Sequence, residues 1–214
     1  MDNNYGSLFI VSTPIGNLDD ITLRAIEVLN NVDICAAEDT RNSKILLNKY
    51  DIKTKLTSYH KFSEKSKTLS LIESLKSGLD IALISDAGTP LISDPGKFLL
   101  EDAIKNQIKV IPIPGATSVI PALTVSGFDL DNFCFYGFFP RQRQAKTRLI
   151  KEIASSNKTS VLFESGKRIE QMLNDLTSLL HPSTNLIVAR ELTKLHETIY
   201  RGDLETVRNS IHES

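Results

Sequence analysis

Four short segments of the sequence combine small, polar or acidic residues with glycine or proline, and each directly follows an apolar run. They are residues 12–18, 37–41, 85–90 and 114–118. A glycine in such a loop lets a ligand approach the main chain, although it also serves in any tight turn. Because the same pattern occurs four times, we expect these loops to form one ligand site.

Several kinds of site are excluded by the motifs that the sequence lacks. It has no glycine-lysine-serine/threonine triplet of a P-loop, no G-x-G-x-x-G fingerprint and no G-x-S-x-G elbow. The four histidines, His60, His181, His196 and His212, are scattered without the spacing of metal ligands. We therefore expect no metal, no nucleotide of the P-loop type and no hydrolase triad.

The first half of the chain alternates between strand and helix patterns. Apolar runs at residues 8–11, 33–37, 81–84 and 109–112 predict strands. A helical stripe is expected over Leu69, Ile72, Leu75 and Leu79, and Asp94 before Pro95 predicts the start of another helix. Such alternation indicates a parallel sheet covered on both faces, with all four loops at the carboxyl ends of its strands.

The second half has a different order of elements. Strands are predicted at residues 133–138, 160–163, 185–189 and 197–201, the last beside the one before it, and helices at 145–154 and 169–180. We interpret the chain as two α/β domains, residues 1–115 with a mostly parallel sheet and residues 116–214, joined near residues 113–118.

Composition and charge favour an ordinary globular protein in a reducing compartment. Of the 214 residues, 41% are hydrophobic and 24% are charged, and no run approaches the ~20 apolar residues of a membrane span. Cys35 and Cys134 both lie in apolar segments, where we expect small buried side chains rather than a disulfide. We predict a cytoplasmic protein without a membrane partner.

The net charge of −1 does not favour a nucleic-acid partner, but the charge is unevenly distributed. Residues 141–151 contain five cations and no acid: Arg141, Arg143, Lys146, Arg148 and Lys151. Such a run is either a solvated helix face or a surface that binds phosphates.

Five motifs carry a resemblance to a known family. The strings PIGNLDDITLRAIEVL, AAEDTR, SDAGTPLISDPG, PIPGATS and ARELTK resemble, in order and spacing, the small-subunit ribosomal RNA methyltransferases of the class III, tetrapyrrole-methylase-like family. The resemblance runs from about Leu8 to Arg201. It implies two α/β domains of the tetrapyrrole-methylase-like fold with the cofactor cleft between them, and a homodimer. The family pattern continues beyond Ser214 with a last strand and a tail.

The resemblance also implies the reaction: S-adenosylmethionine as donor and 2′-O-methylation of a cytidine in the decoding region of 16S ribosomal RNA, within the small ribosomal subunit. The cofactor contacts that it implies are Pro14, Ser85, Asp86, Ala87, Gly88, Thr117, Ser118, Glu164, Ala189 and Arg190. Glu191, in the ARELTK string, is a further candidate acid at the cleft. For Glu164 and Glu191, an ion pair with Arg168 or Arg190 is an alternative role.

A ribose hydroxyl is a weak nucleophile, so a carboxylate near it should help to remove its proton. Asp39 is the first candidate and Glu38 the second, followed by Asp86. Arg141, Arg143, Lys146 and Arg148 are the candidate RNA contacts. Two alternatives stay open: methylation of a small tetrapyrrole-type substrate, and a non-catalytic RNA-binding or assembly factor on the same fold.

Overall fold

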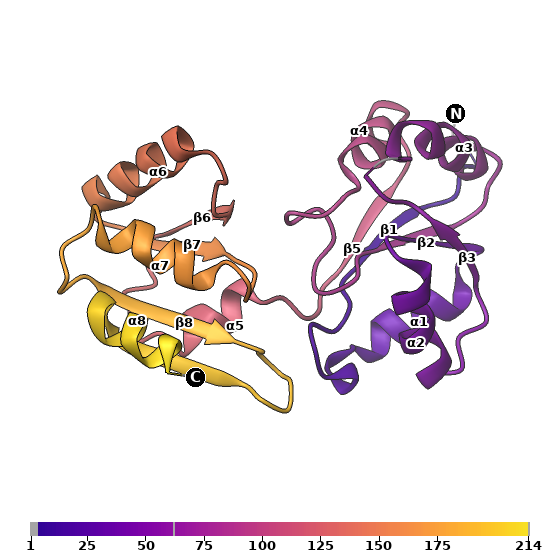
Figure 1. Ribbon diagram of the computed structural model, residues 1–214. Coiled ribbons are helices and arrows are strands. Elements are labelled where there is room, and N and C mark those ends of the chain that lie inside the picture. The colour runs from indigo at the N-terminus through magenta and orange to yellow at the C-terminus, as the bar shows by residue number, and fades with distance from the viewer. Residues whose placement is uncertain (1–3, 62, 214) are drawn as a thin grey trace. The chain divides into compact units, whose positions relative to one another are not determined.

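The chain folds into two compact units, Met1–Ser118 and Val119–Ser214, in a computed structural model that describes residues 4–61 and 63–213 (Figure 1). Each unit is an α/β structure with its own apolar core. In the described ranges, no helix is both long and apolar enough to cross a membrane.

The first unit is built on a five-stranded sheet. Its strands are β1 (Leu8–Val11), β2 (Ile34–Ala37), β3 (Lys55–Ser58), β4 (Ile81–Ile84) and β5 (Val110–Ile113), in the order β3-β2-β4-β1-β5. All four strand pairs are parallel, as predicted. The carboxyl ends of the strands therefore meet at one edge of the sheet, and the loops that leave them start side by side.

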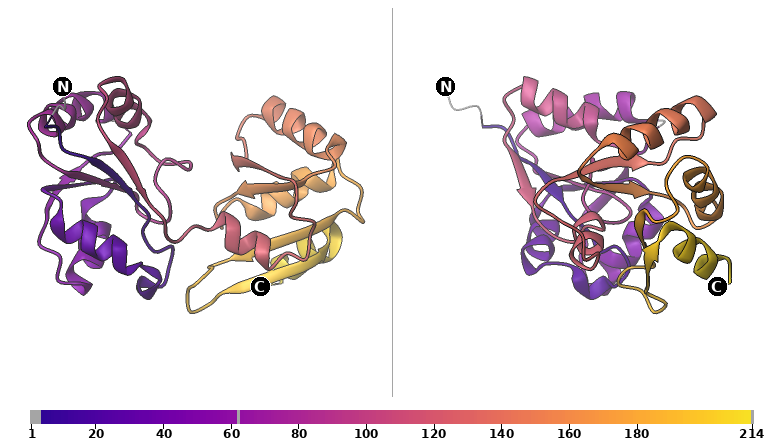
Figure 2. Two further views of the ribbon diagram at one scale, coloured as in Figure 1. Left: turned by 180° about the vertical axis from the view of Figure 1, so that it is seen from behind. Right: turned by 90° about the vertical axis from the view of Figure 1, so that its left-hand side faces the viewer.

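Helices cover both faces of this sheet. They are α1 (Leu23–Asn31), α2 (Thr40–Lys49), α3 (Glu64–Lys76) and α4 (Lys97–Lys105), with a short 3₁₀ turn at Leu18–Asp20. One core cluster joins α3 and α4 to the sheet and a second joins α1 and α2 to it. Figure 1 shows the two helix pairs on opposite sides of the sheet, and Figure 2 shows them again from behind.

The second unit has two small sheets and four helices among its described residues. Strand β6 (Phe133–Phe138) pairs in parallel with β7 (Thr159–Phe163), and β8 (Asn185–Arg190) pairs antiparallel with β9 (Thr198–Asp203). The helices are α5 (Val119–Thr124), α6 (Arg143–Ser155), α7 (Ile169–Thr177) and α8 (Leu204–His212). Phe139, Ile150, Leu173 and Leu204 form the centre of its core.

Two predictions about α3 and α4 were wrong. Leu69 is 68% exposed and Leu79 lies beyond the end of α3, whereas Leu71 faces the core together with Ile72 and Leu75. Helix α4 begins at Lys97 rather than at Pro95, and its N-cap is Gly96, with φ +134°. Asp94 does not cap α4, because the chain first turns at Gly96, whose φ is positive, and the helix starts after it.

Candidate functional site

Three of the four predicted loops are tied to one another at the carboxyl edge of the first sheet. Thr13, after β1, and Gly88, after β4, exchange two backbone hydrogen bonds of 2.9 Å. The hydroxyl oxygen of Thr89 lies 3.0 Å from that of Ser12 and donates to the carbonyl of Ala116 after β5, at 3.3 Å. Thr89 was not singled out in the sequence, although it connects loops from β1, β4 and β5.

Gly88 is buried between the side chain of Ile15 and the backbone of Ala116 and Thr117. Its φ is +81°, which side chains rarely adopt, and a Cβ there would lie 3.3 Å from Cγ2 of Ile15 and 3.8 Å from the carbonyl oxygen of Ala116. The same Cβ would lie 3.9 Å from Cα of Thr117. The structure thus brings the segment after β4 next to the segment that contains Thr117.

Acidic side chains gather at the same edge. Asp86 Oδ1 accepts a hydrogen bond of 3.0 Å from the backbone N–H of Asp39, so the loop after β4 is joined to the loop after β2. Burial, reinforced by the negative charges of Asp94, Asp86 and Asp39, raises the pKa of Glu38. Burial and the charge of Asp86 also raise the pKa of Asp94, although a hydrogen bond from Ser85 opposes this.

Asp39 has a different environment from its neighbour Glu38. Its carboxylate caps α2 by accepting the Arg41 N–H at 2.9 Å, and it also pairs with the Arg41 guanidinium at 2.6 Å. The side-chain hydrogen bond from Arg41, with the backbone bond, lowers the pKa of Asp39 to about 2. Asp39 is therefore an ionised carboxylate at neutral pH, and both of its oxygens already have partners in Arg41 of α2.

The other predicted cofactor residues of the first unit lie near these loops. Pro14 is buried next to Thr13, and Ser85 is buried, with its carbonyl accepting from the Thr13 hydroxyl at 3.1 Å. Asp86 and Ala87 are exposed, while Thr117 and Ser118 are half-buried.

In the second unit, Glu164 follows the carboxyl end of β7 and its side chain is only 3% exposed. Its Oε2 lies 3.1 Å from Arg168 Nη2, so the ion pair considered in the sequence is present. Glu191 pairs with Lys194 at 3.4 Å rather than with Arg190. Ala189 and Arg190 end β8, where Arg190 is exposed.

The basic run divides into one structural cation and several exposed ones. Lys146 is only 18% exposed, pairs with Asp175 at 2.5 Å and lies over the ring of Phe139. Its ammonium group is therefore held inside the second unit. Four cations of the run are exposed on α6 and the residues before it: Arg141, Arg143, Arg148 and Lys151.

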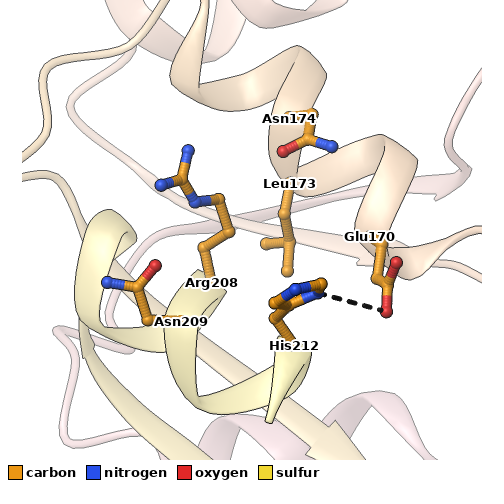
Figure 3. A pocket seen from close by; sticks show the side chains of 6 residues that line it. All are labelled: Glu170, Leu173, Asn174, Arg208, Asn209 and His212. Atoms are coloured by element: carbon orange, nitrogen blue, oxygen red, sulfur yellow. Dashed lines mark ion pairs between the residues drawn. The ribbon is translucent and has the colours of Figure 1, made fainter.

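A pocket of about 290 Å³ lies between α7 and α8 (Figure 3). The ring of His212 points toward Glu170, with Nδ1 4.0 Å from Oε1, and Arg208 lies on the same helix as His212. Its lining residues are Glu170, Leu173, Asn174, Arg208, Asn209 and His212. None of them is a predicted site residue, so the chemistry described above does not depend on this pocket.

Comparison with known proteins decides the family. The model of the tetrapyrrole (corrin/porphyrin) methylases matches residues 7–208. The chain belongs to the tetrapyrrole methylase family. The family and fold that the motifs predicted are thus confirmed.

Curated members of the tetrapyrrole methylase family include close relatives of this chain. It is 45% identical to ribosomal RNA small subunit methyltransferase I of Haemophilus influenzae, over 100% of this chain and 75% of that protein. It is 46% identical to the protein of that name from Halalkalibacterium halodurans, over 95% of this chain and 70% of that protein.

Several solved structures share this fold at low sequence identity. Diphthine synthase superposes with a TM-score of 0.76 at 15% identity, over 94% of this chain and 83% of that one. Cobalt precorrin-4 methyltransferase superposes with a TM-score of 0.72 at 16% identity, over 97% of this chain and 89% of that one. These likenesses show the fold alone.

Methyltransferases of the tetrapyrrole methylase family use S-adenosylmethionine. The described loops of the first unit fit such a cofactor. Asp86 and Ala87, which precede the buried Gly88, are exposed, and the carboxylate of Asp86 can accept hydrogen bonds from amine or hydroxyl groups. The acids at this edge also suit the positive charge of a sulfonium.

Proposed function

We propose that this chain methylates the ribose 2′-hydroxyl of a cytidine in the decoding region of 16S ribosomal RNA, with S-adenosylmethionine as donor. The observation that carries the proposal is the sequence identity of 45% to 46%, over nearly the whole chain, with relatives named ribosomal RNA small subunit methyltransferase I. The small ribosomal subunit is the macromolecular substrate, and a homodimer in the cytoplasm is the form that we expect.

For the cofactor, we propose contacts from the loops at the carboxyl edge of the first sheet. They comprise Pro14, Ser85, Asp86, Ala87, Gly88, Thr117 and Ser118. The hydrogen bonds between Thr13 and Gly88, and from the Asp39 amide to Asp86, support this group because they hold the loops in one arrangement. Glu164, Ala189 and Arg190 of the second unit remain predicted contacts.

When bound, S-adenosylmethionine supplies a methyl group already activated on a positively charged sulfur. The protein therefore has to orient the ribose hydroxyl, exclude water and accept one proton. Glu38 is the better proton acceptor of the two adjacent acids, because burial and three neighbouring carboxylates raise its pKa. Asp39 is a weak base with a pKa of about 2, so we assign it to holding α2 and Arg41.

For the RNA, we propose the exposed arginines Arg141, Arg143 and Arg148 as phosphate contacts. Three guanidinium groups on one short segment can bind several phosphates of a folded RNA. Lys146 has a carboxylate partner in Asp175 and is better explained as part of the second unit's own packing.

The deciding experiment is methyl transfer to purified small subunits that lack the modification, with methyl-labelled S-adenosylmethionine. We expect label in 16S ribosomal RNA and, at one cytidine, resistance of the next phosphodiester bond to alkali, because a methylated 2′-oxygen cannot attack it. Label on a base, or no label despite cofactor binding, would contradict the proposal.

Two further measurements test cofactor binding and the oligomeric state. Calorimetry with S-adenosylmethionine alone distinguishes a methyltransferase from a non-catalytic RNA-binding factor, which would release no binding heat. Light scattering gives the mass in solution, and a mass of 23.8 kDa, that of one chain, would contradict the homodimer.

A further inference from the structure

The loop between β4 and α4 has an unusual backbone. Four of its residues have positive φ angles: Gly88 (+81°), Leu91 (+75°), Ser93 (+72°) and Gly96 (+134°). Leucine and serine rarely adopt this conformation, so the surrounding structure must hold them in it. The same loop contains Asp86 and Gly88, the residues at the centre of the proposed cofactor site.

The two ends of this loop are held by different partners. Near its start, Gly88 is paired with Thr13 of the loop after β1. At its far end, the N–H of Gly96 donates a buried hydrogen bond of 2.8 Å to Oε1 of Glu64, which lies 32 residues earlier in the chain. Gly96 is the N-cap of α4 and has no side chain to cap it, so Glu64 satisfies a backbone donor at this helix start.

Glu64 is placed for this contact by its own helix. It is the first residue of α3 and is only 7% exposed, and a carboxylate at a helix N-terminus interacts favourably with the helix dipole. Next to it, the hydroxyl of the fully buried Tyr59 lies 2.8 Å from that of Thr68. Burial, with a smaller effect of the negative charge of Glu64, raises the pKa of Tyr59 to about 12.

Gly96 packs closely against Leu83 of β4 and against Leu91 of the same loop. A Cβ on Gly96 would lie 2.7 Å from Cδ2 of Leu83, in β4, and 2.7 Å from Cδ2 of Leu91. The backbone at Gly96 therefore packs against the side chain of Leu91 with no room for a Cβ between them, and Leu91 packs against the core and has one of the left-handed backbones. A shift of Gly96 would move Leu91, and through it the loop that leads back to Gly88.

We propose that Glu64 is a positioning residue for the cofactor site: by holding the Gly96 amide, its carboxylate keeps residues 85–96 in the conformation that presents Asp86 and Gly88. The inference rests on the proposed function, because that function assigns this loop to S-adenosylmethionine. Glu64 itself is not expected to touch the cofactor or the RNA.

The test compares Glu64→Ala, which removes the acceptor, with Glu64→Gln, which keeps an acceptor oxygen without the charge. Glu73→Ala on the same helix is the matched control, because Glu73 is 74% exposed. We measure hydrogen exchange of residues 85–96 relative to β4, and the affinity for S-adenosylmethionine by calorimetry. Losing a buried hydrogen bond to a charged group should speed loop exchange and weaken cofactor binding, each by about tenfold or more.

In methyl transfer, Glu64→Ala should raise the KM for the cofactor by a similar factor and leave kcat within a few-fold of the parent, and Glu64→Gln should restore most of the affinity. Unchanged loop exchange, or faster exchange with unchanged cofactor affinity, would overturn the proposal. Equal loss of protection in the loop and in β4 would also overturn it, because Glu64 would then stabilise the whole unit.

Two provisions keep the test decisive. If Glu64→Ala folds too poorly to measure, Glu64→Met fills the same apolar space without an acceptor, and the same outcomes apply to it. If the parent chain itself does not bind S-adenosylmethionine, the proposed function fails, while the exchange of residues 85–96 still decides whether Glu64 holds the loop.

Discussion

Replacing Glu38 with glutamine is expected to slow methyl transfer by about 100-fold or more, because a general base typically contributes about 10²- to 10⁴-fold to a rate. Glutamine keeps the size of the side chain and can still accept a hydrogen bond, but it cannot take up the proton. The neighbouring change Asp39→Asn is the control, since it alters charge and basicity by the same chemistry one residue away.

The difference between the two acids follows from their surroundings. Burial and the nearby carboxylates raise the pKa of Glu38 above its ordinary 4.5, while the hydrogen bonds from Arg41 lower the pKa of Asp39 to about 2. The Glu38 carboxylate is therefore the stronger base of the two. Asp39→Asn should therefore reduce the rate only a few-fold, through weaker capping of α2.

The pH dependence of the methylation rate is a second test, and its direction follows from the raised pKa of Glu38. The parent should lose activity as the pH falls through the raised pKa of Glu38, and Glu38→Gln should lack this acidic limb. A raised carboxyl pKa favours the protonated form of the folded protein. The stabilisation of the folded protein by Glu38 protonation is therefore complete below pH 4.5, the ordinary pKa of this group in the unfolded chain. It is lost as the pH rises through the pKa of Glu38 in the folded protein. At neutral pH, Glu38→Gln should consequently have an unchanged or higher melting temperature than the parent.

The assay is single-turnover methylation with cofactor and small subunits both saturating, at several pH values, so that the measured rate reports the chemical step. A rate for Glu38→Gln within a few-fold of the parent would refute the assignment. So would a hundredfold loss for Asp39→Asn with normal cofactor affinity, which would return Asp39 to the role that the sequence first suggested. If neither change matters, Asp86→Asn is the next variant to measure.

Three further changes test other parts of the molecule. Gly88→Val should weaken S-adenosylmethionine binding by at least about tenfold in calorimetry, because its Cβ would meet Ile15 and its backbone would be strained in the left-handed conformation. Gly166→Val is the control and should bind normally, because a Cβ at Gly166 would have no atom within 4 Å. Replacing the three exposed arginines, Arg141, Arg143 and Arg148, with alanine should make the binding of small subunits less dependent on salt. The slope of log binding constant against log salt concentration should become shallower by about 2. An unchanged slope would show that the basic run is an ordinary solvated helix face. Lys146→Met should lower the free energy of unfolding by about 1 kcal/mol in a denaturant titration and leave that slope unchanged, because Lys146 is paired with Asp175.

The sheet of the first unit was predictable because most of its strands are buried on both faces. Ile81–Ile84 is buried at every position, so it appears in the sequence as an unbroken apolar run. The edge strand β3 and the helix α2 were missed for the opposite reason. Lys55–Ser58 is half-buried at the sheet edge, and α2 is a largely polar helix that buries only Ser43, Leu46 and Leu47.

The location of the candidate loops was predictable, but their internal chemistry was not. Parallel strands fix which edge the loops share, so the sequence could group residues 12–18, 85–90 and 114–118 before any contact was known. Glu38 and Asp39, in contrast, are adjacent acids with the same local sequence context. Their difference in basicity depends on Asp94 and Asp86, which are distant in sequence, and on the turn that points Asp39 back to Arg41.

The start of α4 explains why local signals fail in this particular loop. Asp94 before Pro95 is a good helix-start signal, yet the cap contact comes from Glu64, 32 residues away, and the helix begins only after Gly96. The same loop also holds Gly88 against Thr13 after β1 and against the segment after β5. Between the contacts at Gly88 and Gly96, Leu91 and Ser93 have the left-handed backbone that such residues rarely adopt. Deviations from local sequence rules are therefore expected where distant parts of the chain must hold a binding loop in place.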